Sequence, residues 1–380
     1  GHIYPGLAVV EELKEMLDRE SIDGGYQIIW IGANKGMDKD LVEKSDVVDK
    51  FVGIPCGKLR RYFSLQNFFD LFKIGAGLIR SFFLLARLKP AIVFSKGGFV
   101  SVPPCYAAKA LKIPVFTHEC DFTTGLATRL NTKVAKTLFV SYQETREKLS
   151  QSIQAKTIVS GNPVRPVFFN SDAQKGREFI FGTQTDAGSK TDAVEKSQVD
   201  KPILLVVGGS LGAKQINELV WNSIDWLCEK FVVVHQTGKQ DEIRHFEGEN
   251  YKDYHQFEFI YSQMADVMCA SDIILSRAGA NFLWEAMSQN KPMVLIPLGG
   301  EGSRGDQIDN AQYFANKGCA IMLDCNTVGN EELKSALESL LDKNRRIQMS
   351  ENAKILCGEK RATKIIAEEI LKIIKTRATR

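Results

Sequence analysis

The chain has 380 residues, 44% of them hydrophobic and 25% charged, with a formal net charge of +3. This length predicts two domains, and so weak a positive charge gives no basis for a nucleic-acid partner. The eight cysteines are scattered without a Cys-x-x-Cys pair, which predicts reduced thiols, and we find neither a secretory signal peptide nor an apolar run of membrane-spanning length.

The first half of the chain alternates predicted helices with short apolar strands. Helical spacing at 7–19 follows Gly1-His2, and such a start predicts a strand and a glycine loop before Gly1. A further helix is predicted at 103–111. Strands are predicted at 28–32, 47–54, 90–95, 113–117, 138–140 and 157–159.

The segment 58–89 is apolar almost throughout and yet carries regularly spaced cations. Its residues that suit a membrane surface are Phe68, Phe72, Lys73, Arg80, Phe83 and Arg87. The three cations recur every seven residues, so on a helix they form one stripe. Charges interrupt the run too often for a transmembrane helix. Two interpretations stay open: a helix on an anionic membrane surface, or a core helix whose basic face is merely solvated.

Glycine-rich loops follow several predicted strands, at the end where parallel α/β folds bind ligands. Ser95–Ser101 precedes a helix, so its backbone N–H groups can cradle a phosphate. Gly208–Gly212 follows the predicted strand 203–207 and offers the same geometry. The alternative for this second loop is tight strand–helix packing with no ligand.

Ser276–Glu285 has the pattern of the turn in a βαβ unit, between predicted strands at 273–275 and 293–297. Glu285 lies about one turn into the predicted helix 281–289. Its two carboxylate oxygens can accept the two neighbouring hydroxyl donors of a ribose, while the helix N-terminus suits phosphate. The stretch therefore predicts a nucleotide site, although any strand–turn–helix unit has a similar pattern.

The second half repeats the alternation after a linker. Residues 171–200 predict a flexible insertion, with a stray strand at 179–181. Other predicted elements are helices at 213–226, 264–270, 308–317, 331–341 and 362–375, and strands at 231–235, 257–260 and 321–323. The order predicts an α/β fold of two doubly wound domains, 1–165 and 166–361, facing each other across a cleft.

The titratable residues suggest chemistry without a metal or another cofactor, because the five histidines lack zinc spacing with cysteine. His2 is a candidate general base, or else it orients its loop by hydrogen bonding. His118, Glu119 and Asp121 crowd one strand end, where they either share the proton transfer or organise the loop. The dinucleotide pattern Gly-x-Gly-x-x-Gly is absent, which argues against a dehydrogenase.

Several blocks, taken together and in order, resemble a known family. They are Gly1–Ala8, Ser95–Ser101, His118-Glu119, Gly161–Arg165, Gly208–Gly212, His235–Gly238, Ser276–Glu285 and Gln307–Ala311. The chain resembles the MurG family, within glycosyltransferase family 28, over nearly its whole length except about 171–200. The resemblance implies a GT-B fold and an inverting enzyme that moves N-acetylglucosamine from UDP-N-acetylglucosamine to the 4-hydroxyl of the muramyl sugar of lipid I. The product would be lipid II for peptidoglycan synthesis.

The resemblance also implies roles for matched positions. Ile260 would offer its backbone to the uracil, Glu285 would hold the ribose, and His2 would stay the candidate base. The implied donor-binding set is Gly1, Asp121, Arg165, Ser210, Ile260, Ala280, Glu285 and Gln307. The lipid I diphosphate would meet Ser95, Gly97, Gly98 and Ser101.

Location and partners follow from the same resemblance. The apolar segment 58–89 would rest on the cytoplasmic face of the bacterial cell membrane, and the helix at 362–380 would pack back on the N-terminal domain. Cell-wall synthesis proteins are further expected partners. The family commonly has Asn where this chain has Asp121, and some members have Gln or His at Asp306. Because the upstream strand and loop are missing, we expect this chain to be weakly active or unstable.

Two competing functions stay open. One is another GT-B UDP-sugar enzyme, such as a 2-epimerase or a glycolipid transferase, against which the Ser95–Ser101 loop and the block ending at Arg165 argue. The other is a non-catalytic, membrane-associated binder of UDP-sugars. Such a binder would keep Glu285 but tolerate the loss of His2.

Overall fold

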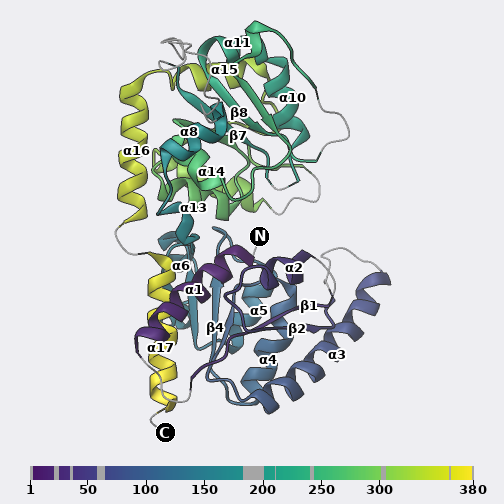
Figure 1. The fold of residues 1–380 in the computed structure, drawn as a ribbon. Helices are drawn as coiled ribbons and strands as arrows, with labels where there is room; N and C mark the ends of the chain where they lie inside the picture. Colours follow the sequence, from purple (N-terminus) through teal and green to yellow (C-terminus); the bar gives the residue numbers. More distant parts are fainter. Residues whose placement is uncertain are drawn as a thin grey trace. The chain divides into compact units, whose positions relative to one another are not determined.

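The computed structural model describes residues 3–20, 25–34, 37–57, 65–182, 201–209, 211–239, 244–300, 305–358 and 361–378. The chain divides into two compact units (Figure 1). The first comprises Gly1–Arg165 together with Glu359–Arg380, and the second comprises Pro166–Gly358. Each is an α/β unit built on parallel strands, which confirms the predicted fold class.

The first unit holds a two-stranded and a four-stranded parallel sheet, with the order β1-β2 and β3-β4-β5-β6. The strands are β1 (Ile29–Ala33), β2 (Lys50–Ile54), β3 (Val93–Ser95), β4 (Val115–Glu119), β5 (Thr137–Val140) and β6 (Thr157–Val159). All five residues of β4 are buried, as expected for a strand covered on both faces. The carboxyl ends of β3, β4 and β6 carry the sequence blocks singled out above.

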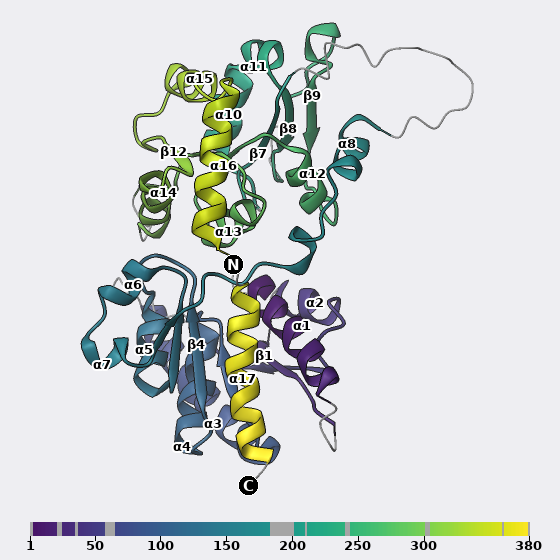
Figure 2. The same ribbon diagram turned by 90° about the vertical axis from the view of Figure 1, so that its left-hand side faces the viewer.

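Helices cover these sheets. They are α1 (Ile3–Arg19), α2 (Met37–Glu43), α3 (Leu65–Leu88), η1 (Phe99–Ser101), α4 (Val102–Ala110), α5 (Leu126–Val134), α6 (Gln143–Glu147), α7 (Gln151–Gln154) and α17 (Ala362–Ala378). The C-terminal α17 packs on α1 (Figures 1 and 2), where Thr363 Oγ1 donates to Glu12 Oε2 at 3.2 Å. Ile366 and Ile370 join a core cluster with Val9. The last helix is thus part of the N-terminal unit.

The second unit has one six-stranded parallel sheet, with the order β12-β11-β10-β7-β8-β9. The strands are β7 (Ile203–Val207), β8 (Val232–Gln236), β9 (Tyr254–Phe257), β10 (Ile273–Ser276), β11 (Met293–Leu295) and β12 (Ala320–Met322). Chain order runs outward in both directions from the neighbouring pair β7 and β10. This pair is the topological switch point, outside which open α/β sheets bind ligands.

The helices of this unit flank the sheet. They are η2 (Pro166–Phe168), α8 (Ala173–Phe181), α10 (Lys214–Asn222), α11 (Ile224–Lys230), η3 (Glu249–Tyr251), α12 (Met264–Ala270), α13 (Ala280–Ser288), α14 (Asp306–Asn316), α15 (Asn330–Glu338) and α16 (Lys343–Cys357). The long α16, which the sequence patterns did not predict, runs beside α13 (Figure 2). Its apolar residues do not follow one stripe, which explains why it was missed.

The predicted stray strand at 179–181 is wrong, because these residues end helix α8. Asp172 caps this helix by accepting the N–H of Gln174 at 2.8 Å. Phe179 stacks on Phe257 with ring centroids 5.0 Å apart, and α8 packs against α12. Residues 171–182 therefore belong to the packed unit, while 183–200 of the predicted flexible insertion lie outside the described residues.

Two further predictions need correction. The single helix at 213–226 is two helices, since Ser223 leaves the helical region with φ −113° and ψ 11°. The strand predicted at 257–260 lies earlier, at β9, which is an edge strand. An edge strand tolerates polar residues such as Gln256, so its sequence was not an apolar run.

Helix α3 bears on the core-helix interpretation of its segment. Asp70, Gly77, Ser81 and Leu85 face inward and are buried. The outer face nevertheless exposes large apolar side chains, namely Leu71, Phe72, Leu78, Ile79, Phe82 and Phe83. A core helix is therefore wrong for this face. Among the helices that the structure describes, none is long and apolar enough to cross a bilayer.

Candidate functional site

A pocket of about 390 Å³ lies at the carboxyl ends of β7 and β10, at the switch point of the second unit. It is lined by Val207, Gly208, Gly209, Gly212, Ala213, Lys214, Gln215, Arg277, Gly279, Phe282, Leu298 and Gln307. The two turns predicted to face a ligand, Gly208–Gly212 and Ala278–Ala280, both reach this place. The register pairs Ser276 with Val207, so the two strands end side by side.

The glycines of this pocket allow close approach of two loops. A Cβ on Gly238 would lie 2.3 Å from the backbone nitrogen of Gly212, and Gly238 has φ +73°. A side chain at Gly238 would therefore push the β8 loop off the β7 loop. Gly212 is thus packed closely against the loop after β8. Gly208, Gly209 and Gly212 also line the pocket.

Gln236, at the end of β8, joins two parts of the site. Its Oε1 accepts the backbone N–H of Ile260 at 2.9 Å, and its Nε2 donates to the carbonyl of Gly209 at 3.4 Å. The predicted base-binding residue Ile260 is thereby tied to the glycine loop. The Ile260 N–H is thus already engaged, and Gln236 holds this part of the backbone in place.

Arg277 follows β10 and braces the floor of the pocket. Its Nη1 donates to Gln215 Oε1 and to the carbonyls of Ile296 and Pro297, all at 3.0–3.1 Å. Burial lowers the pKa of this guanidinium. Through these three hydrogen bonds, Arg277 connects the end of β10 with the segment after β11 and with α10.

Helices α13 and α14 carry three predicted donor residues near their starts. Ala280 is buried at the start of α13, behind the N-cap Gly279. Glu285 is only 8% exposed on the same helix. Gln307 lies in the first turn of α14, where its Oε1 accepts the N–H of Leu298 at 3.0 Å. This bond orients the Gln307 side chain so that its amide nitrogen is the group left to meet a ligand.

His235, in β8, is held in the core beneath these loops. Its Nε2 lies 3.0 Å from Asn217 Oδ1 and its Nδ1 lies 2.9 Å from Tyr254 Oη. Asn217 donates its amide to the carbonyl of Thr237 at 3.0 Å, so its oxygen must accept from Nε2. Burial lowers the pKa of His235 to about 3. It is a neutral structural histidine.

In the first unit, the Ser95–Ser101 loop is held from below by a residue that sequence reasoning missed. Asn131, fully buried on α5, donates to Ser95 Oγ at 3.0 Å and to Ser101 Oγ at 2.8 Å. Ser95 Oγ also accepts the Gly97 N–H, and Ser101 Oγ donates to the carbonyl of Gly98. The two serines therefore fix the loop, and Gly97 and Gly98 form its tip with φ +89° and +79°.

Glu119 organises the neighbouring loop after β4. Its Oε1 accepts the N–H groups of Cys120 and Asp121, and its Oε2 accepts that of Gly125 at 2.9 Å. Glu119, Cys120 and Asp121 could geometrically surround a metal ion. The carboxylate is already saturated by backbone donors, and burial raises the pKa of the Cys120 thiol to about 12. These groups fit a folded loop better than a metal site.

Arg165 lies at the end of the first unit, where its guanidinium carbon is 4.6 Å from the centre of the Tyr4 ring. This contact places Arg165 beside the first turn of α1. Four predicted site positions lie outside what the structure describes: Gly1, His2 and Ser210 entirely, and the side chain of Phe68.

Sequence reasoning missed the residues that support the candidate loops within each unit. They are Lys96, Asn131 and Asn162 in the first unit, and Gln215, Gln236 and Arg277 in the second. Each adjoins a predicted ligand loop or lies beneath one. Their signal was polarity inside an otherwise apolar run or next to a glycine turn. Without the structure, nothing distinguishes such residues from solvated ones.

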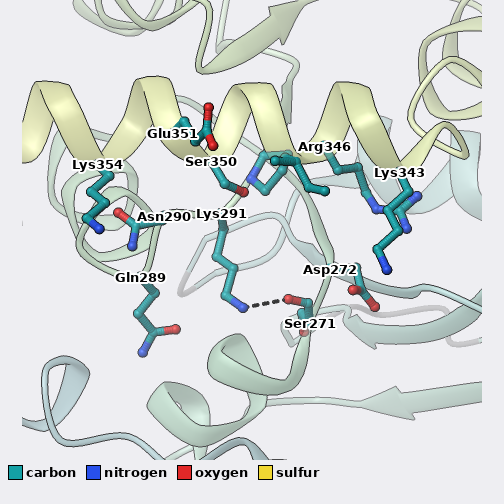
Figure 3. A pocket seen from close by; sticks show the side chains of 12 residues that line it. Ser271, Asp272, Gln289, Asn290, Lys291, Lys343, Arg346, Ser350, Glu351 and Lys354 are labelled. Atoms are coloured by element: carbon teal, nitrogen blue, oxygen red, sulfur yellow. Dashed lines mark hydrogen bonds between the residues drawn. The ribbon is translucent and has the colours of Figure 1, made fainter.

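A second pocket of about 390 Å³ lies between α16 and the amino ends of β10 and β11 (Figure 3). Lys291 donates there to the carbonyls of Cys269 and Ser271, at 2.7 and 2.8 Å, and Arg346 donates to the carbonyls of Leu340 and Leu341. Burial lowers the pKa of Lys291. Two cations of the pocket thus already donate to backbone carbonyls. The pocket also lies at the amino ends of the strands, away from the switch point.

Models of known families match both halves of the chain. The glycosyltransferase family 28 N-terminal domain matches residues 1–140, and the glycosyltransferase family 28 C-terminal domain matches residues 203–369. The chain belongs to glycosyltransferase family 28. The predicted family is confirmed.

Curated relatives within family 28 narrow the similarity to MurG. A UDP-N-acetylglucosamine–N-acetylmuramyl-(pentapeptide) pyrophosphoryl-undecaprenol N-acetylglucosamine transferase of Treponema denticola is 50% identical over 341 residues, covering 85% of this chain and 81% of the relative. The enzyme of the same name from Treponema pallidum is 38% identical over 382 residues, covering 99% and 93%.

Solved structures agree on the family 28 architecture. Acinetobacter baumannii MurG superposes with a TM-score of 0.69 at 23% identity, covering 98% of this chain and 96% of that one. A UDP-GlcNAc 2-epimerase from Neisseria meningitidis reaches 0.64 at 18% identity, covering 98% and 97%. At these identities the structures establish the fold alone, which they share as GT-B.

Proposed function

We propose that this chain transfers N-acetylglucosamine from UDP-N-acetylglucosamine to the 4-hydroxyl of the muramyl sugar of lipid I, with inversion, and releases UDP and lipid II. The observation that carries the proposal is the pocket at the β7–β10 switch point, whose lining includes Gly279 and Phe282 at the start of α13. Glu285 is buried on the same helix. The near-full-length similarity to enzymes that bear this activity in their names supports the choice of substrates.

The donor occupies the second unit in this proposal. The uracil meets the backbone at Ile260, and Glu285 accepts the two ribose hydroxyls. The diphosphate meets the Gly208–Gly212 loop with Ser210. Arg165, which belongs to the first unit, keeps the diphosphate contact that the resemblance implies. The sugar lies near Ala280 and the Gln307 amide. The α10 and α13 N-termini add donors that favour the negative charge of the leaving UDP.

The acceptor occupies the first unit. Its diphosphate meets the tip of the Ser95–Ser101 loop. Asp121, on the neighbouring loop after β4, keeps the donor-binding role that the resemblance implies. The 4-hydroxyl oxygen attacks the anomeric carbon while the bond from that carbon to the UDP oxygen breaks. His2 takes the hydroxyl proton as general base. No residue of this scheme requires a metal ion.

The outer face of α3 supports a location on the membrane that holds the lipid acceptor. Phe72 is 65% and Phe83 is 69% exposed, and Arg80 and Arg87 flank them. Lys73 pairs with Asp70 at 3.0 Å, so its charge is partly neutralised. An apolar helix face with flanking cations binds anionic lipid surfaces. We place the chain peripherally on the cytoplasmic face of the bacterial cell membrane, where cell-wall synthesis proteins are accessible partners.

The test follows UDP release and disaccharide formation from UDP-N-acetylglucosamine with and without a lipid I analogue. We expect UDP release only with the acceptor, and its loss in His2→Ala. Formation of UDP-N-acetylmannosamine without acceptor would establish an epimerase instead. Donor binding without any turnover would favour a non-catalytic binder.

A second experiment tests the ribose contact directly. Glu285→Ala is expected to weaken UDP binding about 30-fold, since a hydrogen bond to a charged group contributes about 2 kcal/mol. The 2′,3′-dideoxy analogue of UDP should bind both proteins equally. Glu338→Gln, an exposed glutamate on α15, is the matched control and should bind UDP as the wild type does. An equal loss for both ligands would refute the ribose role of Glu285.

A further inference from the structure

Lys96 follows β3 and precedes the two glycines of the Ser95–Ser101 loop, yet it points into the first unit. The residue is only 7% exposed. Its Nζ lies 2.8 Å from His118 Nδ1 and donates to Asn162 Oδ1 at 3.1 Å. A lysine in a glycine loop is commonly a phosphate ligand, so this inward orientation needs an explanation.

The hydrogen bonds fix the protonation of His118. An ammonium group has three donors and no acceptor, so His118 Nδ1 must accept from Lys96. His118 Nε2 lies 2.9 Å from the carbonyl of Gly161, which can only accept, so Nε2 carries the proton. Both ring nitrogens are engaged, and His118 is a neutral link in a network. It is not available for proton transfer.

The network joins the carboxyl ends of three strands. Lys96 follows β3, His118 lies in β4, and Gly161 and Asn162 follow β6. Burial lowers the pKa of Lys96, while the nearby Glu119, Cys120 and Asp121 act in the opposite direction. A long polar side chain at the centre of three loops orients them together, because moving any one loop breaks a buried hydrogen bond.

We propose that Lys96 is a positioning residue for the acceptor diphosphate: its ammonium holds His118 and Asn162, and the backbone at the tip of the loop, rather than the ammonium, meets the diphosphate. This inference rests on the proposed function, since that assigns the loop to the acceptor. The role of Lys96 differs from those proposed for Arg165 and His2, which contact the substrates directly.

The kinetic test uses Lys96→Met, which keeps an unbranched side chain one atom shorter than that of lysine and removes its donors. With a short-chain, water-soluble lipid I analogue, we expect the acceptor KM to rise about tenfold and the donor KM to stay within about twofold. The dependence of the acceptor KM on salt should match that of the wild type, because no ligand charge is lost. Lys109→Met, an exposed lysine on α4, is the control. A flattened salt dependence, or an unchanged acceptor KM, would overturn the proposal.

A spectroscopic test needs only the wild-type chain and so does not depend on how the variant folds. The ¹⁵N shifts of His118 should report a protonated Nε2 and an accepting Nδ1. Saturating geranyl diphosphate should leave the Nδ1 shift in place. Its movement to the value of a free nitrogen would show that the ammonium turns to the ligand, against the proposal. The two proposals can fail separately. If the chain binds geranyl diphosphate with an unchanged His118 Nδ1 shift but shows no turnover, the transfer reaction is refuted and the role of Lys96 is not.

Discussion

Gln236 Oε1 accepts the backbone N–H of Ile260 at 2.9 Å, and this bond fixes the geometry of the expected base site. The Gln236 amide reaches the carbonyl of Gly209 on its other side, at 3.4 Å. One side chain therefore couples the loop proposed for the uracil with the loop proposed for the diphosphate. Both contacts are made by this one side chain, so a change at Gln236 should affect both loops.

Gln236→Ala should weaken UDP binding without abolishing it. Loss of the bond that orders Ile260 costs about 1 kcal/mol, which is about fivefold in the dissociation constant. Isothermal titration of UDP measures the change. Gln312→Ala, which removes an exposed glutamine on α14, is the control and should change nothing. Unaltered UDP binding in Gln236→Ala would mean that the loop orders itself or that the base binds elsewhere.

The strands and the glycine turns were predictable from the sequence because buried parallel strands are continuous apolar runs. The patterns placed β6, β7 and α12 at their observed bounds. They failed where tertiary context decides, as at α8, where Phe179–Phe181 has strand composition but stacks on Phe257 as part of a helix. Helix α16 was missed because its apolar residues follow no single face.

The ligand loops could be located from the sequence, but their internal support could not. Gln307 lies in the first turn of α14 and lines the pocket, and Glu285 is buried on α13, whose N-cap Gly279 also lines it. Lys96 and Asn131 support the other loop through bonds between residues 22 to 66 positions apart. Only the folded chain shows that these polar side chains point inward.

The apolar outer face of α3 should control membrane binding. Replacing Phe72, Ile79 and Phe83 together by Ser removes three side chains that are each more than half exposed, so the fold should be retained. Partition into phosphatidylglycerol-containing vesicles should fall at least tenfold, since each buried large apolar side chain contributes about 1.5–3 kcal/mol. Sedimentation with vesicles measures it.

The matched control for α3 is Ile355→Ser on α16, an apolar side chain that is 79% exposed in the other unit. It should leave vesicle binding unchanged. Turnover of a water-soluble acceptor should stay at the wild-type level in both variants. If the triple variant still sediments with vesicles, another surface binds the membrane.

His235 should make the second unit less stable in acid. Burial lowers its pKa from 6.5 to about 3, so the folded chain keeps it neutral while the unfolded chain binds a proton below about pH 6.5. The contribution is complete above about pH 6.5 and is lost progressively as pH falls toward 3. At pH 5 the loss is about 2 kcal/mol, at about 1.4 kcal/mol for each pH unit.

Urea unfolding at pH 7.5 and 5.0 compares the wild type with His235→Gln. The comparison separates the contribution of His235 to the pH dependence from that of His255, whose pKa is also lowered by burial. The variant is expected to lose less stability between the two pH values. Titration of the wild-type imidazole by NMR is the independent check, and a proton taken up by His235 near pH 6 would contradict the buried neutral state.

Two glycines in α3 test how closely the helix packs while its other face stays exposed. A Cβ on Gly77 would lie 2.3 Å from the carbonyl oxygen of Pro55, whereas one on Gly75 would meet nothing within 4 Å. Gly75→Ala should therefore stabilise the chain by up to about 1 kcal/mol through helix propensity. Gly77→Ala should destabilise it by about 1–3 kcal/mol, because the backbone after β2 must move. Urea midpoints compare the pair. Equal stabilisation by both changes would mean that α3 does not pack closely on Pro55.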